Sequence, residues 1–298
     1  MSHKGAFLLI RCPAKLNLFL EVVRRRPDGY HDLDTVMQAI DLYDELRVFP
    51  RAEPTLTMEC DDASLPTDER NLVLRAAIAL RDHACHRAGA HFVLAKRIPS
   101  QAGLGGGSSD AAGALIGLNR AWGLGLSTEA LRQLAAAVGS DVAFFLYGGA
   151  ARCTGRGEAV EPLAVGSRQH YILLCPPVAV STAEAYRNLR FPLTSAPADA
   201  TMLARSLAKG DIEGLGHSLY NRLEEPAFAL RPELRELKGR LAATGLFAGV
   251  GMTGSGSALF GLCGPGHWQR AHEGVAALHL GAVHAVQSIS RGVAVQPE

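Results

Sequence analysis

The residues between Ala102 and Asp110 are four glycines, one leucine and two serines, a composition that suits phosphate binding. Glycine loses more conformational freedom on ordering than any other residue, so the segment is either a flexible connector or a loop whose backbone approaches a ligand closely. We expect a strand before it and a helix after it. In that arrangement loop amides and the free N–H groups of the first helical turn attract an anion. Ser108 and Ser109 add hydroxyls that could donate to phosphate or reach a magnesium ion.

The segment matches neither of the two common phosphate loops. No lysine follows the glycines, as GxxxxGK[ST] requires, and Ser108 occupies the last position of GxGxxG. The glycines alone therefore leave both interpretations open.

Three further segments carry polar side chains that suit phosphoryl transfer. Lys15 and Asn17 point the same way at the start of an expected strand, where a lysine is more often a solvated edge residue. Asp141 follows a helix-ending glycine and is either a helix N-cap or a partly buried carboxylate that orients or deprotonates a substrate hydroxyl. The turn with Thr253 and Gly254 is either a hairpin loop or a segment that closes over the transferred phosphate.

The composition restricts the class of protein. A chain of 298 residues is long enough for two domains, and 48% hydrophobic with 20% charged residues is typical of a soluble globular protein. The net charge of +1 argues against nucleic-acid binding, and the arginine triplet 24–26 is interpreted as a solvated turn. No apolar run reaches the roughly 18 residues of a membrane span, and the first apolar stretch is too short for a signal peptide.

The cysteines and histidines give no metal or disulfide signature. Six scattered cysteines without a CxxC pair predict reduced thiols and a cytoplasmic location. The histidines and cysteine of the segment 82–86 lack further ligands elsewhere, so we interpret them as the polar end of a helix.

The elements that must position these residues follow from the hydrophobic pattern. We expect strands at 16–23, 45–50, 55–60, 91–98, 170–180 and 282–289, and two strands around a turn in 247–263. We expect helices at 71–84, 109–122, 127–139, 182–189, 198–210, 212–223, 232–245 and 267–281. Residues 142–155 form an apolar stretch that breaks into glycines. A polar segment at 161–168 is the expected domain boundary, followed by an α+β domain with a mostly antiparallel sheet.

The ordered segments PAKLNLFL, DGYH, GLGGGSSDAA, GSDVAFF and MTGSGSALF resemble the GHMP kinase superfamily over nearly the whole chain. PAKLNL together with RPDGYH is similar to the branch that phosphorylates 4-diphosphocytidyl-2-C-methyl-D-erythritol with ATP, in the non-mevalonate route to isoprenoid precursors. The resemblance implies an α+β fold with two domains. Residues 1–163 would form a ribosomal-protein-S5-domain-2-like domain with the phosphate loop, and residues 164–298 a ferredoxin-like domain that closes over the substrate.

The resemblance also implies roles for individual residues. Asp141 would accept or orient the proton of the 2-hydroxyl, and Lys15 would pair with it and neutralise charge in the transition state. ATP with Mg²⁺ would be the cofactor, and Ser108 is our candidate metal ligand. The expected nucleotide-binding residues are Asn71, Lys96, Ser100, Ala102, Gly103, Leu104, Gly105, Gly106, Gly107, Ser108, Ser109, Thr253 and Gly254.

The partner implied by the resemblance is a small molecule with a cytidine diphosphate head. Asn17 and Thr182 would contact it, Tyr30 would offer a stacking face, and His31 would offer a hydrogen-bonding edge. Tyr186 would be the second aromatic around the base; from the sequence alone it is an ordinary packed helix residue. We expect a monomer or a weak homodimer.

Two departures and three alternatives accompany this hypothesis. Ala143 stands where we expect proline, which puts the placement of Asp141 in question, and MTGSGSALF is a slight variant of its motif. The alternatives are a GHMP kinase for another alcohol, a nucleotide-binding regulator without catalysis, and a dehydrogenase. The glycine spacing argues against the dehydrogenase, and the presence of both Lys15 and Asp141 argues against the regulator.

Overall fold

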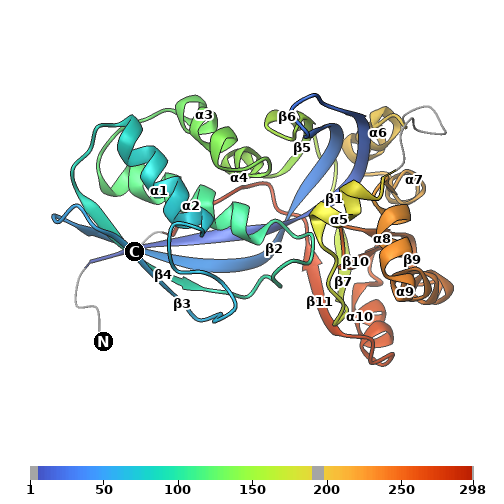
Figure 1. Cartoon of the computed structure of the whole chain (residues 1–298). Coiled ribbons are helices and arrows are strands. Elements are labelled where there is room, and N and C mark those ends of the chain that lie inside the picture. Colours follow the sequence, from blue (N-terminus) through green and yellow to red (C-terminus); the bar gives the residue numbers. More distant parts are fainter. Residues whose placement is uncertain (1–5, 190–197, 297–298) are drawn as a thin grey trace.

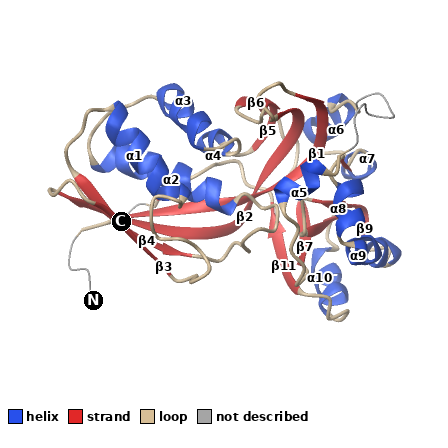
Figure 2. Ribbon diagram, viewed as in Figure 1, coloured by secondary structure: helices blue, strands red, loops and turns tan. Residues whose placement is uncertain are grey.

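The computed structural model describes residues 6–189 and 198–296, which form two β-sheets covered by helices (Figures 1 and 2). The first sheet has the strand order β12-β1-β2-β4-β3. In addition, β5 pairs with β2, β6 pairs with β5, and β8 pairs with β1. The second has the order β11-β7-β10-β9. The expected α+β class is therefore confirmed.

The strands of the first sheet are β1 (Leu8–Arg25), β2 (His31–Arg51), β3 (Leu56–Cys60), β4 (Gly89–Ala95), β5 (Ala150–Gly155), β6 (Ala159–Leu163), β8 (Tyr220–Asn221) and β12 (Ala294–Val295).

A long antiparallel hairpin of β1 and β2 forms the centre of this sheet. Both strands extend well beyond the ranges expected from the sequence, because polar residues interrupt the apolar alternation but are buried with partners. Gln38, for example, donates from its side-chain amide to the carbonyls of Ala39 and Gly149. Strand β1 also contributes to all three hydrophobic clusters, so it joins the two halves of the molecule.

Four helices cover one face of the first sheet (Figure 1): α1 (Leu72–His83), α2 (Gly106–Ala121), α3 (Thr128–Val138) and α4 (Val142–Tyr147). Helix α2 lies close to β1 because glycine occupies the contact positions. A Cβ atom on Gly113 would lie 2.6 Å from the sulfur of Cys12. This close packing fixes the position of α2 relative to β1, the strand that contains Lys15.

The second sheet consists of β7 (His170–Cys175), β9 (Phe247–Met252), β10 (Leu259–Cys263) and β11 (Ala282–Gln287), all antiparallel as expected. The helices of this half are α5 (Thr182–Arg187), α6 (Thr201–Lys209), α7 (Ile212–His217), α8 (Glu224–Leu230), α9 (Pro232–Ala243) and α10 (Trp268–Ala276). Alternation along β7 separates its two faces. Tyr171 and Leu173 lie in the cluster that includes Leu16 and Leu18 of β1, whereas Ile172 and Leu174 lie in a different cluster, which includes residues of α8 and α9.

The structure defines one stretch to which the sequence analysis assigned no element, and it corrects the expected helix 212–223. The apolar stretch 142–155 splits into α4 and β5, because two glycines with positive φ, Gly148 and Gly149, end the helix and turn the chain. The expected helix 212–223 is α7 followed by the short strand β8, and α8 was not expected. Strands β8 and β12 come from the second half of the chain but pair with β1 in the first sheet.

Candidate active site

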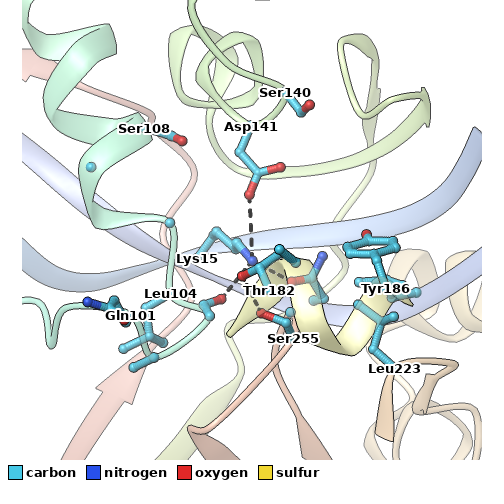
Figure 3. A pocket seen from close by; sticks show the side chains of 18 of the residues that line it. Lys15, Gln101, Leu104, Ser108, Ser140, Asp141, Thr182, Tyr186, Leu223 and Ser255 are labelled. Carbon is cyan, nitrogen blue, oxygen red and sulfur yellow. Dashed lines mark hydrogen bonds and ion pairs between the residues drawn. The ribbon is translucent and has the colours of Figure 1, made fainter. Parts of the chain in front are cut away.

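A cavity of about 980 Å³ lies where the glycine-rich segment, β1, α5 and the turn between β9 and β10 meet. Figure 3 shows Lys15 and Asp141 pointing toward each other in it, with Ser108 on one side and Tyr186 on the other. Among the described residues, no helix is long and apolar enough to cross a membrane.

Lys15 is buried at the base of this cavity, with only 3% of its side chain exposed. Its ammonium donates to the side-chain oxygen of Asn17 and to the carbonyl of Gly103 at 2.7 Å, and lies 3.8 Å from Asp141 Oδ2. Burial lowers the pKa of Lys15, and the nearby Asp141 carboxylate opposes that effect. The lysine is thus not the solvated edge residue that its position in the sequence first indicated.

Asp141 occupies the N-cap position of α4, but its side chain makes no capping hydrogen bond. The carboxylate is 30% exposed, with one oxygen toward Lys15 and access to the cavity. Ala143, which replaces the expected proline, is fully buried in α4. A carboxylate in this position is able to accept a hydrogen bond or a proton from a hydroxyl bound in the cavity.

The glycine-rich segment is a tightly packed turn and not a flexible connector. Gly103 has φ +78°, and a Cβ atom there would lie 2.1 Å from the carbonyl oxygen of Thr253. Gly105 has φ +73° and precedes α2, which begins three residues earlier than expected, at Gly106. The first intrahelical bond runs from Ser109 N to Gly105 O, so the amides of residues 106–108 form the open first turn beside the cavity.

Some of the remaining residues expected at the phosphate site line the cavity, and others are buried away from it. Ser100, Ala102, Leu104, Ser108 and Gly254 line the cavity. Ser109 does not line it: its side chain is fully buried, and the hydroxyl has no hydrogen-bond partner in the described part of the chain. Thr253 is also buried, where its hydroxyl accepts from Asn17 N at 3.1 Å and donates to Gly103 O at 3.0 Å.

Two of the expected nucleotide-binding residues, Asn71 and Lys96, are engaged in other interactions. Asn71 caps α1: it accepts from Val73 N at 3.0 Å and donates to Pro66 O at 2.8 Å. The ammonium of Lys96 lies between the buried carboxylates of Asp44 and Asp110. Lys96 still lines the cavity, whereas Asn71 does not.

This buried group of charges lies directly behind the start of α2. Burial disfavours the charged form of Lys96, but the two carboxylates outweigh burial and raise its pKa. Burial also raises the pKa of Asp110. A Cβ atom on Gly106 would lie 3.1 Å from Lys96 Nζ, so the group supports the loop from beneath.

The aromatic side of the cavity differs in detail from the expected pair of Tyr30 and Tyr186. The ring of His31 stacks on Tyr186, with centroids 4.9 Å apart and an interplanar angle of 27°. Tyr30 is 54% exposed, and the Arg156 guanidinium covers its ring at 5.0 Å. Thr182 lines the cavity, and its hydroxyl is 2.7 Å from that of Ser255.

Sequence reasoning did not select several residues of the cavity wall. Ser255 belongs to the glycine-serine turn already singled out, so its neighbours Thr253 and Gly254 were the signal. No local pattern marked Gln101, Leu223 or Arg187, because only the folded chain brings them to the cavity.

Family models and individual relatives both indicate that the chain belongs to the GHMP kinases. Residues 71–149 match the family model of the GHMP kinases N terminal domain, and residues 203–278 match that of the GHMP kinases C terminal. The chain is similar to the 4-diphosphocytidyl-2-C-methyl-D-erythritol kinase of Shouchella clausii (strain KSM-K16), with 41% identity over 85% of this chain and 84% of the relative. For the same enzyme of Pelotomaculum thermopropionicum (strain DSM 13744 / JCM 10971 / SI) the identity is 45% over 84% and 86%.

Two solved structures are similar to this chain over almost its whole length. A 4-(cytidine 5'-diphospho)-2C-methyl-D-erythritol kinase is similar with a TM-score of 0.78 and 39% identity, over 94% of this chain and 98% of that one. A homoserine kinase from Cytophaga hutchinsonii ATCC 33406 has a TM-score of 0.76 over 99% of both chains. Its identity is 19%, so that likeness shows the fold alone.

Proposed function

Because this chain belongs to the family of the 4-diphosphocytidyl-2-C-methyl-D-erythritol kinases, within the GHMP kinases, we propose that it phosphorylates that compound. The γ-phosphoryl group of ATP would pass to the 2-hydroxyl, giving the 2-phosphate and ADP in the non-mevalonate route to isoprenoid precursors. One observation carries the proposal at residue level. The Lys15–Asp141 pair lies in a single cavity between the glycine-rich turn and the His31–Tyr186 stack.

Asp141 is the residue proposed to act on the substrate hydroxyl. Phosphoryl transfer requires an oriented nucleophile and stabilisation of the charge on the transferred group, with little covalent work by the protein. The carboxylate of Asp141 would accept the hydroxyl proton. Lys15 would hold the carboxylate in place and place positive charge beside the phosphoryl oxygens, and its own position is held by Asn17 and Gly103.

The phosphates of ATP would lie against the open first turn of α2. Amides of residues 106–108 point from a helix N-terminus that borders the cavity, and α2 has 16 residues to supply the dipole. The tight packing of Gly103 and Gly105 preorganises this turn.

Magnesium is part of the proposal, and the available oxygen donors fit it. Within residues 6–189 and 198–296 no group of three or more His, Cys, Asp or Glu side chains is arranged to hold a metal ion. The cavity does present the Ser108 hydroxyl and the Asp141 carboxylate. Mg²⁺ typically takes one or two protein oxygens and completes its shell with phosphates and waters. When bound, it would screen the charge of the phosphate oxygens.

The cytidine base would bind at the aromatic side of the cavity. The rings of His31 and Tyr186 stack on each other, and the ring of Tyr30 is exposed with the Arg156 guanidinium over it. The base would lie between Tyr30 and Tyr186, and this arrangement requires His31 to leave its stacked position or to contact the base edge. Thr182 and Asn17 would contact the rest of the substrate.

The test is ADP release with Mg-ATP and 4-diphosphocytidyl-2-C-methyl-D-erythritol, run beside homoserine, mevalonate and galactose. Turnover of the cytidine compound alone is the expected result. Turnover of another alcohol instead would support a kinase activity but would contradict the proposed binding of cytidine. No turnover of any of the four, with ATP still bound, would favour a nucleotide-binding regulator.

A further inference from the structure

Two arginines line the cavity without a carboxylate partner in the described part of the chain. Three other cations of the cavity wall are engaged: Lys15 lies beside Asp141, Lys96 between two carboxylates, and Arg156 over the Tyr30 ring. The remaining two are Arg25 and Arg187, which are both exposed.

Arg25 belongs to the arginine triplet that the sequence alone indicated to be a solvated turn. Strand geometry separates the members of this triplet. Arg24 pairs with Asp32 across the hairpin and binds its carboxylate at 2.5 Å, with 75% of the arginine side chain exposed. The next residue, Arg25, points to the opposite face, where its cross-strand partner is His31. Burial lowers the pKa of His31, and the charge of Arg25 lowers it further, as expected for two groups that lie close together.

Arg187 approaches the same place from the other half of the molecule. It follows Tyr186 at the end of α5, and its Nε donates to the carbonyl of Ala183 at 3.3 Å. His31 and Tyr186 stack on each other. Arg25 lies across the hairpin from His31, and Arg187 is the residue that follows Tyr186. The two arginines come from different halves of the chain and line one cavity.

We infer that Arg25 and Arg187 bind the diphosphate of the substrate's nucleoside diphosphate head and are specificity-determining residues for it. This inference rests on the proposed function, because it concerns the same site. The planar guanidinium forms paired hydrogen bonds with phosphate oxygens, and both arginines line the cavity. A nucleoside without phosphates has nothing for these two residues to bind. The difference in affinity between CDP and cytidine therefore measures their contribution.

The experiment measures inhibition constants of CDP and of cytidine, each as a competitor of the cytidine substrate. The variants are Arg25→Gln, Arg187→Gln and the double variant, which remove charge but keep most of the side-chain length. Arg24→Gln is the matched control, since it removes the same charge from the neighbouring position on the outer face. We expect each single substitution to weaken CDP about three- to tenfold, the strength of a partly exposed charged hydrogen bond, with cytidine changed less than about twofold. In Arg24→Gln both constants stay within about twofold, and the KM for ATP is unchanged in all variants.

The outcomes separate the inference from the proposed function. Equal weakening of CDP and cytidine, or no change in either, would overturn the inference while the wild-type protein still binds both ligands. Wild-type protein that binds neither CDP nor cytidine would overturn the proposed function as well. Salt gives an independent readout: the preference for CDP over cytidine should fall with ionic strength in the wild type and stay flat in the double variant.

Discussion

The ammonium of Lys15 donates a hydrogen bond at 2.7 Å to the carbonyl oxygen of Gly103, which lies 88 residues further along the chain. A second bond joins the same segments, from Lys15 N to Leu104 O at 3.0 Å. The lysine that faces Asp141 is therefore held by the glycine-rich turn. A displacement of that turn would also move Lys15, so the glycine-rich turn and the Lys15–Asp141 pair form one structural unit.

Replacement of Asp141 by asparagine is expected to abolish most turnover and to leave ATP bound. The amide keeps the size of the carboxylate but cannot accept a proton from the hydroxyl, and general-base groups contribute about 10²- to 10⁴-fold to rate. The measurements are kcat and the calorimetric Kd for ATP. Asp82→Asn, at a 70% exposed site at the end of α1, serves as the control. Unchanged turnover in Asp141→Asn would remove this residue from the mechanism.

Gly103→Ala is expected to destabilise the protein and to reduce turnover. The new methyl group would meet the Thr253 carbonyl at 2.1 Å in addition to requiring positive φ. Gly123→Ala is the matched control, because φ is +62° there but no atom lies within 4 Å of the added methyl group. Left-handed strain alone costs about 1–2 kcal/mol, and we expect overpacking to add about 1–3 kcal/mol at Gly103. Urea unfolding of both variants gives the difference, and equal losses would mean that the turn is not tightly packed.

The residues that we propose for catalysis could be selected from the sequence because each belongs to a contiguous motif. Lys15, Asp141 and the glycines are recognisable from their immediate neighbours in the sequence. The structure was needed to decide between interpretations that a motif leaves open. At Asp141, for example, the N-cap position is real, but the side chain does not cap the helix.

What the sequence did not reveal depends on contacts between distant segments. The position of Lys96 between Asp44 and Asp110 joins three separate elements, and no local pattern indicates these two partners. The orientation of Arg25 depends on its register with His31 across the hairpin, and composition had suggested only a solvated triplet. Strand β8 pairs with β1 from 201 positions away, beyond the reach of any local pattern.

Tyr186→Leu is expected to raise the KM for the cytidine substrate about tenfold while the KM for ATP changes little. Stacking of a base on an aromatic ring is worth about 1–3 kcal/mol, and leucine retains the apolar volume that packs against the core of this half. Tyr186→Phe keeps the stacking face and should change KM less than about twofold. Steady-state kinetics with each substrate varied in turn separate the effects. Equal changes in both KM values would make Tyr186 a packing residue only.

The Asp110→Asn variant tests how the charges behind the glycine-rich turn are balanced. One lysine faces two buried carboxylates, and burial raises the pKa of Asp110 from its ordinary 3.8 to about 8. Because the folded state then holds a proton that the unfolded state releases, the contribution of Asp110 to stability is complete below about pH 4 and is lost as pH rises toward 8.

We therefore expect Asp110→Asn to flatten the pH dependence of the unfolding free energy between about pH 4 and pH 8. The variant should gain on the wild type as pH rises, since the amide never has to lose a proton. Asp44→Asn is the contrasting variant: Asp44 also accepts from the amides of Arg97 at 2.6 Å and Ile98 at 2.9 Å. Its replacement should cost about 3 kcal/mol at neutral pH, as loss of one partner of a buried pair does. Urea unfolding at a series of pH values measures both, and an unchanged slope in Asp110→Asn would show that Asp110 is ionised in the folded protein.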